Sequence, residues 1–167
     1  MVRPWVKQSI LIVAAAFVLS QFFPVQRDNP PVDPAHTLYT ATPVPADIHA
    51  IFDRSCRDCH SHETVWPWYS HLAPVSWVIA NDVHGGRKHF NISEWNTYPD
   101  EKKARKFGDI CEQVKSGEMP DSKYTFIHQG TGLNADQRTA ICNWAESARK
   151  AMNVPPSATP APAPHGQ

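Results

Sequence analysis

Apolar side chains recur at helical spacing in four segments of the chain, and no segment shows a convincing strand pattern. The clearest segment covers residues 100–116. Asp100 suits the start of a helix there, and Gly117 is placed to stop it. Its apolar positions follow the i, i+3, i+4 and i+7 spacing of one helix face: Phe107, Ile110, Cys111 and Val114.

The last periodic segment, residues 135–152, predicts a helix whose start is marked by a capping box. Asn134 stands at the cap position and Gln137 follows three residues later. The segment also carries an apolar stripe: Ile141, Trp144, Ala145 and Ala148.

Two earlier segments predict helices with less regular patterns. The first runs over residues 46–60, and its apolar positions are Ile48, Ile51 and Phe52. The second begins near Pro74, a residue that fits the first turn of a helix, and its apolar side chains are Trp77, Val78 and Val83. The pair Gly85-Gly86 is predicted to end or kink this helix. Four helices and no strand predict an all-α domain.

The N-terminal residues 1–25 have the pattern of a signal or signal anchor. Arg3 and Lys7 precede a short apolar run, and Phe22 and Phe23 extend that run beyond a passable cleavage site. This extension favours an uncleaved membrane helix over a cleaved signal peptide, although the run is somewhat shorter than a typical spanning helix. The predicted location is the bacterial inner membrane with a cytoplasmic N-terminus and a periplasmic domain; the alternative is a soluble periplasmic protein.

Proline marks the predicted boundaries of the folded domain. The chain of 167 residues has 16 prolines against 7 glycines, and they concentrate on either side of a central region. Residues 26–45 are interpreted as a Pro-rich linker and residues 153–167 as a disordered Pro/Ala-rich tail. Residues 46–152 are then the domain, large enough for one modest core. The formal net charge of zero gives no reason to expect a nucleic-acid partner.

Cys56-Arg57-Asp58-Cys59-His60 is the attachment signature of a c-type haem. Each thiol of such a motif adds to one vinyl group, and the adjacent imidazole becomes an axial ligand of the iron. Two other interpretations fit less well. A structural zinc site needs four ligands, commonly from a second close pair of cysteines, and a thioredoxin-like pair needs a βαβ context. The motif therefore predicts one covalent haem.

Met119 is the favoured distal ligand. It stands in the segment Gly117-Glu118-Met119-Pro120 directly after a predicted helix, and a Met/His pair raises the potential of a cytochrome c haem. Gap-filling in the core is the ordinary role of a methionine and remains the alternative. Histidines elsewhere compete for the same position: His62, His71, His84, His89 and His128.

Several side chains near the motif are candidates for the haem pocket. Trp66, Trp68 and Tyr69 follow the motif closely and could wall the haem, or they could be ordinary core aromatics. Arg87 could pair with a haem propionate, or it could be a solvated surface charge.

Long segments of the chain resemble the haem-binding domain family of exported bacterial proteins. The resemblance covers about residues 30–150 and rests on CHSHETVWPWYSHLAPVSW, NDVHGGRKHFNISEW and GEMPDSKYTFIH. It implies that Cys56, Cys59 and His60 attach and ligate the haem, and that Met119 is the methionine of the family's G-E-M-P segment. Ile92 stands where an aromatic residue is expected. The order of the elements also resembles single-haem class I cytochromes c.

Cys111 and Cys142 fall on the third and fourth predicted helices. Resemblance to c-type cytochromes implies attachment of haem outside the bacterial inner membrane, and that compartment permits disulfides. A disulfide between these two residues and a pair of buried free thiols both remain open.

The predicted function is electron transfer by a mono-haem c-type cytochrome that is not an enzyme and that meets redox partner proteins. The alternatives are a peroxidase-like enzyme, which needs an open iron site with polar distal groups, and a haem sensor or subunit of a respiratory complex.

Overall fold

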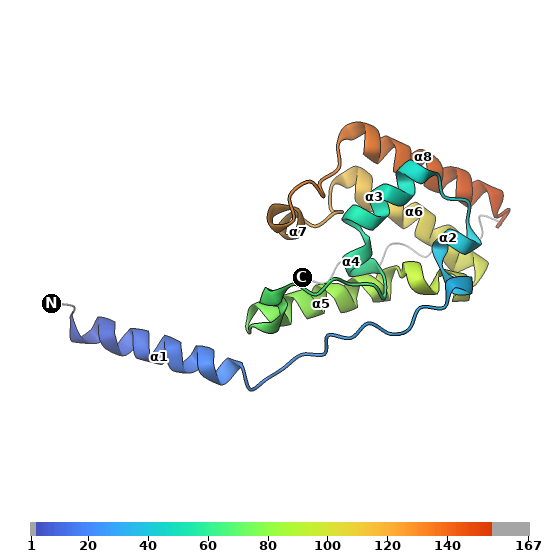
Figure 1. Cartoon of the computed structure of the whole chain (residues 1–167). Helices are drawn as coiled ribbons and strands as arrows, with labels where there is room; N and C mark the ends of the chain where they lie inside the picture. Colours follow the sequence, from blue (N-terminus) through green and yellow to red (C-terminus); the bar gives the residue numbers. More distant parts are fainter. Residues whose placement is uncertain (1–2, 155–167) are drawn as a thin grey trace.

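The computed structural model describes residues 3–154, and within this range every regular element is a helix. The prediction of an all-α fold is confirmed. Most of the predicted tail lies outside the described residues. The elements, shown in Figure 1, are α1 (Pro4–Ser20), η1 (Pro34–His36), α2 (Leu38–Ala41), α3 (Ala46–Ser55), α4 (Arg57–His60), η2 (Trp68–His71), α5 (Val75–His89), η3 (Ile92–Thr97), α6 (Asp100–Ser116), α7 (Ser122–Ile127) and α8 (Ala135–Ala151).

Helix α1 projects away from the other helices (Figure 1) and buries none of its residues. Its apolar side chains, among them Ile10, Val13 and Phe17, are exposed. Over the range 3–154, no helix combines the length and the apolar character needed to cross a membrane. The membrane-spanning segment predicted within residues 1–25 is not confirmed.

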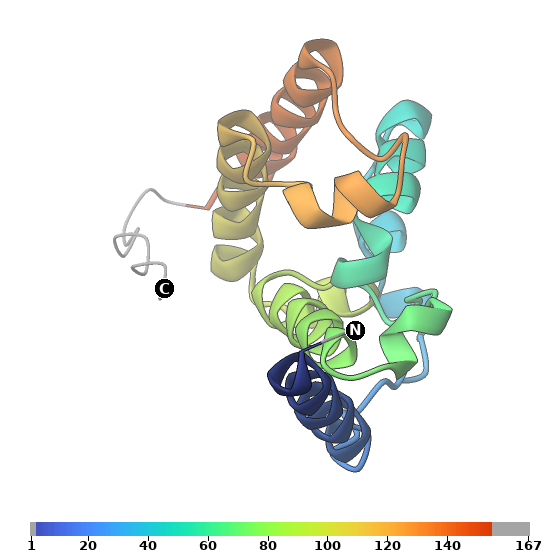
Figure 2. The same cartoon turned by 90° about the vertical axis from the view of Figure 1, so that its left-hand side faces the viewer.

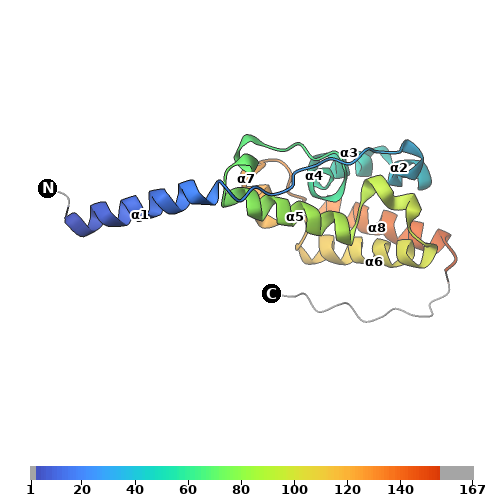
Figure 3. The same ribbon diagram turned by 90° about the horizontal axis from the view of Figure 1, so that it is seen from below.

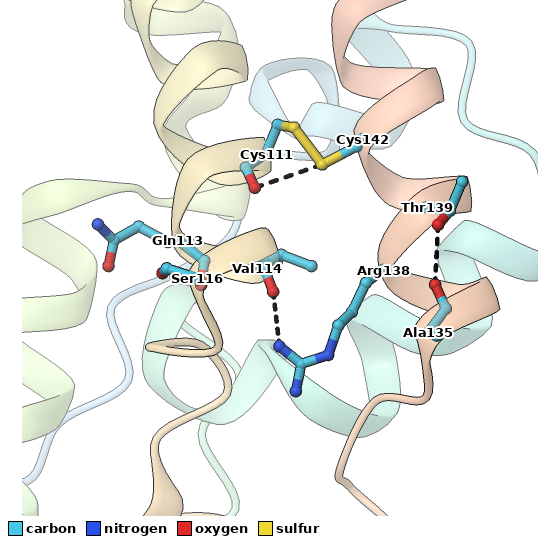
Figure 4. The surroundings of a disulfide bond; sticks show 8 residues. All are labelled: Cys111, Gln113, Val114, Ser116, Ala135, Arg138, Thr139 and Cys142. Carbon is cyan, nitrogen blue, oxygen red and sulfur yellow. Dashed lines mark hydrogen bonds between the residues drawn. A yellow bond between two sulfur atoms is a disulfide. The ribbon is translucent and has the colours of Figure 1, made fainter.

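Helices α6 and α8 lie side by side (Figure 2). Both have the predicted bounds to within one residue, and Gly117 ends α6 with φ 86° in the left-handed region. The capping box of Asn134 and Gln137 is present. A disulfide joins Cys111 of α6 to Cys142 of α8, and Arg138 Nη1 donates to Val114 O at 2.7 Å nearby (Figure 4).

Five aromatic side chains form a closed ring in the core. Phe107 of α6 contacts Trp95 at 4.8 Å and Trp144 at 5.5 Å between ring centroids. Phe90 contacts Trp95 at 5.6 Å, and Phe52 closes the ring with Trp144 at 5.4 Å and Phe90 at 6.4 Å. Edge-to-face packing of this kind adds about 0.5–1.5 kcal/mol per pair beyond the burial of area.

Two predicted helices differ from those observed. The helix predicted over residues 46–60 breaks at Cys56, whose φ of −127° lies outside helical values, into α3 and the single turn α4. The helix predicted to end or kink at Gly85-Gly86 continues to His89. A Cβ on Gly86 would lie 2.5 Å from Cys59 O, so glycine is required there for close packing of α5 against α4.

The structure also differs from the predicted linker at residues 26–45. Leu38 of α2 is fully buried, and Trp144 Nε1 donates to Pro43 O at 3.0 Å. Residues 34–45 therefore belong to the folded domain. The preceding residues 21–33 run along α5 as an extended segment, as Figure 3 shows from below.

Candidate functional site

The Cys-x-x-Cys-His motif occupies the break between α3 and α4. Cys56 ends α3 and precedes α4, and Cys59 and His60 lie on that single turn. The packing of α4 on α5 fixes the turn, because Gly86 allows the backbone of Cys59 to approach.

The ring of His60 is held by two backbone carbonyls of α5 and its end. Nδ1 lies 3.0 Å from Gly86 O and 3.0 Å from Phe90 O. Carbonyl oxygens only accept hydrogen bonds, so Nδ1 carries the proton and donates, and Nε2 keeps its lone pair. Burial lowers the pKa of His60, which favours the neutral imidazole. A neutral imidazole with Nδ1 on a carbonyl is the form in which histidine binds metals through Nε2.

Neither Cys56 nor Cys59 forms a disulfide. Burial raises the pKa of each thiol to about 12. Both thiols therefore stay protonated at neutral pH, unlike the low-pKa cysteines of disulfide oxidoreductases. This chemistry does not favour the thioredoxin-like interpretation.

A cavity of about 660 Å³ lies beside the motif, a volume within the range of cofactor and small-molecule sites. Its walls come from α4 and the loop that follows the motif, from α5, and from α7 with its preceding loop. Its apolar lining is Cys59, Val65, Pro67, Val75, Val78, Ile79, Val83, Phe126 and Ile127, and its polar lining includes Asp58, Tyr69, Asp82, Tyr124 and His128.

Among the predicted pocket residues, only Tyr69 lines the cavity. Trp68 is 75 % exposed, and Trp66 donates its indole N–H to Asn29 Oδ1 at 3.2 Å. Arg87 donates to the backbone and side chains of the extended segment and of the loop after the motif. The structure therefore gives Arg87 protein partners rather than leaving it as a free surface charge.

The candidates for the distal ligand have different environments. Met119 is 37 % exposed in the loop after α6 and does not line the cavity, although Asp121 and Ser122 of the same loop do. Among the five competing histidines, only His128 lines it. His62 is buried instead against Asn91, whose Nδ2 lies 2.9 Å from its Nε2.

Helix α7 supplies a polar wall that the hydrophobic pattern did not predict. Tyr124 donates to Asp58 Oδ2 at 2.9 Å and stacks on His128 with 4.2 Å between ring centroids. His128 Nε2 lies 3.0 Å from the hydroxyl of Tyr69. Burial and the Asp58 carboxylate raise the pKa of Tyr124. The one sequence signal for this short helix is Asp121, which caps it by accepting from the backbone N–H of Lys123 at 2.7 Å.

The zinc interpretation finds no support in the site. Cys111 and Cys142 are joined to each other and cannot serve as zinc ligands with Cys56 and Cys59. Within the described part of the chain, no group of three or more His, Cys, Asp or Glu side chains could hold a metal ion.

A family model described as a haem-binding domain matches residues 15–147. The matched span contains the Cys-x-x-Cys-His motif, the cavity lining and the core helices α6 and most of α8. Neither the curated proteins nor the solved structures yield a match.

Proposed function

The chain belongs to the haem-binding domain family, and on that premise we propose that it is a mono-haem c-type cytochrome that carries electrons. Cys56 and Cys59 tether the haem through thioether bonds, and His60 is its proximal ligand. The haem supplies a reversible one-electron couple, and the protein supplies attachment, axial ligation and exclusion of water.

The arrangement of His60 carries this proposal. Its Nδ1 is held by two carbonyls at 3.0 Å, which leaves Nε2 as the coordinating atom. The two thiols stand three residues apart beside it, and Cys59 faces a largely apolar cavity. Backbone hydrogen bonds to a ligating histidine fix its tautomer and orientation and raise its basicity. The donor set and its surroundings therefore fit a covalent haem.

Met119 is the proposed distal ligand. Its loop continues within two residues into the cavity wall at Asp121, which makes Met119 the internal methionine nearest in sequence to that wall. A thioether and an imidazole would together supply the two protein ligands of a six-coordinate iron suited to outer-sphere electron transfer.

The proposed location is the bacterial inner membrane, with α1 as the anchor and the haem domain in the periplasm; the alternative is a soluble periplasmic protein from which the signal has been cleaved. Arg3 and Lys7 precede the exposed apolar run that begins at Ile10 of α1, which is the order of an export signal. The disulfide between Cys111 and Cys142 suits an oxidising compartment. Redox partner proteins are the proposed donors and acceptors.

Covalent attachment is tested by acid–organic extraction of the purified, exported protein. The haem is expected to stay with the polypeptide, and it should become extractable in a Cys56→Ala, Cys59→Ala double variant. A wild-type protein that releases its haem, or that holds none, would overturn the proposal.

The distal ligand is tested by the near-infrared charge-transfer band of methionine-ligated low-spin iron. Met119→Ala is expected to abolish this band. Met152→Ala is the matched control, because Met152 packs against the core and not at the cavity. A wild-type low-spin iron without this band, which becomes high-spin in His128→Ala but not in Met119→Ala, would assign the position to the histidine.

A peroxidase-like or sensing function is the second candidate, favoured by the pair Tyr69–His128 on the cavity wall. Such a function needs an open iron position next to polar groups. It predicts a high-spin iron with exchangeable water and peroxide turnover that falls in His128→Ala. A low-spin iron without turnover would reject it.

A further inference from the structure

Arg87 joins three segments that are distant in the sequence. Its Nε donates to Ser61 O at 2.7 Å, its Nη1 to Asp28 O at 2.9 Å, and its Nη2 to both Asn29 Oδ1 and Thr64 Oγ1 at 2.9 Å. A guanidinium has five N–H donors in a rigid fork, so these bonds occupy most of them. Arg87 thus ties α5 both to the loop after the haem motif and to the extended N-terminal segment.

Residues 21–29, which we call the strap, are held to the domain along their length. Asn29 accepts from Arg87 and from Trp66 Nε1, and its Nδ2 donates to Thr64 O at 2.9 Å. At the other end, the amide of Gln21 makes a pair of hydrogen bonds with the backbone of Ala73 at 3.0 and 3.1 Å. Trp77 Nε1 donates to Phe23 O between them, at 2.9 Å. The strap is therefore a docked segment and not a flexible tether.

The contacts of Arg87 bracket the proximal histidine. Ser61 follows His60 directly, and its carbonyl accepts from Arg87 Nε. Gly86 precedes Arg87 directly, and its carbonyl accepts from His60 Nδ1. One guanidinium therefore links the backbone that carries His60 to the segment of α5 that orients its ring.

We propose that Arg87 is a positioning residue for the proximal histidine and that docking of the strap through Asn29 holds it in place. When the strap is released, Arg87 loses two of its acceptors and the hydrogen bond from His60 Nδ1 to Gly86 O loosens. A weaker hydrogen bond at Nδ1 makes the imidazole a poorer donor to iron, which favours the reduced haem. Docking of the strap thus lowers the reduction potential, and release raises it. This inference rests on the proposed function, because it requires iron on His60.

Two substitutions that preserve charge test the proposal in the full-length haem-loaded protein. Asn29→Ala removes the side-chain acceptor that the strap gives Arg87 and leaves Asp28 O, and Arg87→Lys keeps the positive charge but loses the fork. Each is expected to raise the midpoint potential measured by spectroelectrochemistry and to alter the low-spin EPR signal, which reports the orientation of the axial ligands. The double variant is expected to show less than the sum of the two shifts, because both act through one network.

Gln21→Ala is the matched control. It removes two hydrogen bonds of the same strap without touching Arg87, so the midpoint potential should stay at the wild-type value although proteolysis within residues 21–29 increases. Asn29→Asp keeps the acceptor oxygen and should not raise the potential.

Unchanged potentials in both Asn29→Ala and Arg87→Lys would overturn the inference, and so would an equal rise in Gln21→Ala. If Arg87→Lys does not mature, the midpoint potentials of Asn29→Ala and Gln21→Ala still test the inference, because both residues are exposed. A wild-type protein without covalent haem would instead refute the proposed function, before any variant is compared.

Discussion

Gly86 and Gly85, adjacent residues inside α5, allow a matched test of how α4 is positioned. An alanine Cβ at Gly86 would lie 2.5 Å from the carbonyl oxygen of Cys59 and 3.2 Å from its Cβ. The same Cβ at Gly85 would meet nothing within 4 Å. Only Gly86→Ala therefore forces the turn with the haem motif away from α5.

The expected difference in the free energy of unfolding comes from the contributions that the two substitutions do not share. Both substitutions gain about 0.5–1 kcal/mol of helix stability, because both replace a glycine inside a helix by alanine. Overlap with a packed backbone costs Gly86→Ala about 1–3 kcal/mol. Loss of the hydrogen bond from His60 to Gly86 O adds about 1 kcal/mol. We expect the free energy of unfolding of Gly85→Ala to be slightly higher than that of the wild type. That of Gly86→Ala should be about 2–4 kcal/mol lower than that of Gly85→Ala.

Denaturant unfolding of the full chain with its disulfide intact measures both variants, with the free energy of unfolding from linear extrapolation. Haem staining of denatured protein on gels measures attachment, which should fall only in Gly86→Ala. Equal stability and equal haem content in the two variants would refute the argument that Gly86 sets the position of Cys59.

Three further predictions concern the core and the periphery. Reducing the disulfide of Cys111 and Cys142, which are 31 residues apart, should lower the free energy of unfolding by about 3–4 kcal/mol in a denaturant titration. Phe107→Ala should cost about 3–5 kcal/mol in the same assay, because Phe107 is 2 % exposed and contacts two indole rings, and a cost near zero would contradict the aromatic ring. Burial, with a smaller contribution from Asp53, raises the pKa of Tyr39 above the ordinary tyrosine pKa of 10.0. The contribution of Tyr39 to stability is therefore fully present at pH values below 10.0 and is lost as the pH rises above that value. Tyr39→Phe should therefore lose less stability than the wild type between neutral and strongly alkaline pH, and identical pH profiles would contradict this.

The elements that could be predicted from the sequence are those whose apolar face makes the core. Helices α6 and α8 have regular apolar spacing and local start and stop signals, and their bounds agree with the prediction. The Cys-x-x-Cys-His motif could be identified because its chemistry depends on local spacing alone.

The features that could not be predicted depend on tertiary partners. Nothing in the local pattern distinguishes the break at Cys56 from a continuous helix. The role of Gly86 as a packing glycine inside α5, and not as a helix stop, depends on its contact with Cys59. Helix α7 has only six residues and buries none, so it carries no periodic signal. The hydrogen bonds of Asn29 join residues far apart in sequence, so the local pattern assigns residues 21–25 to the signal anchor and residues 26–29 to the Pro-rich linker. The role of Met119 stays a prediction.

The ring of five aromatic side chains that includes Phe107 packs without using the cavity beside the motif, because none of its five members lines that cavity. The disulfide between Cys111 and Cys142 joins two helices of this same region and also lies outside the cavity lining. In the proposed cytochrome, a substitution that disturbs only the cavity wall should therefore leave the packing of this region intact.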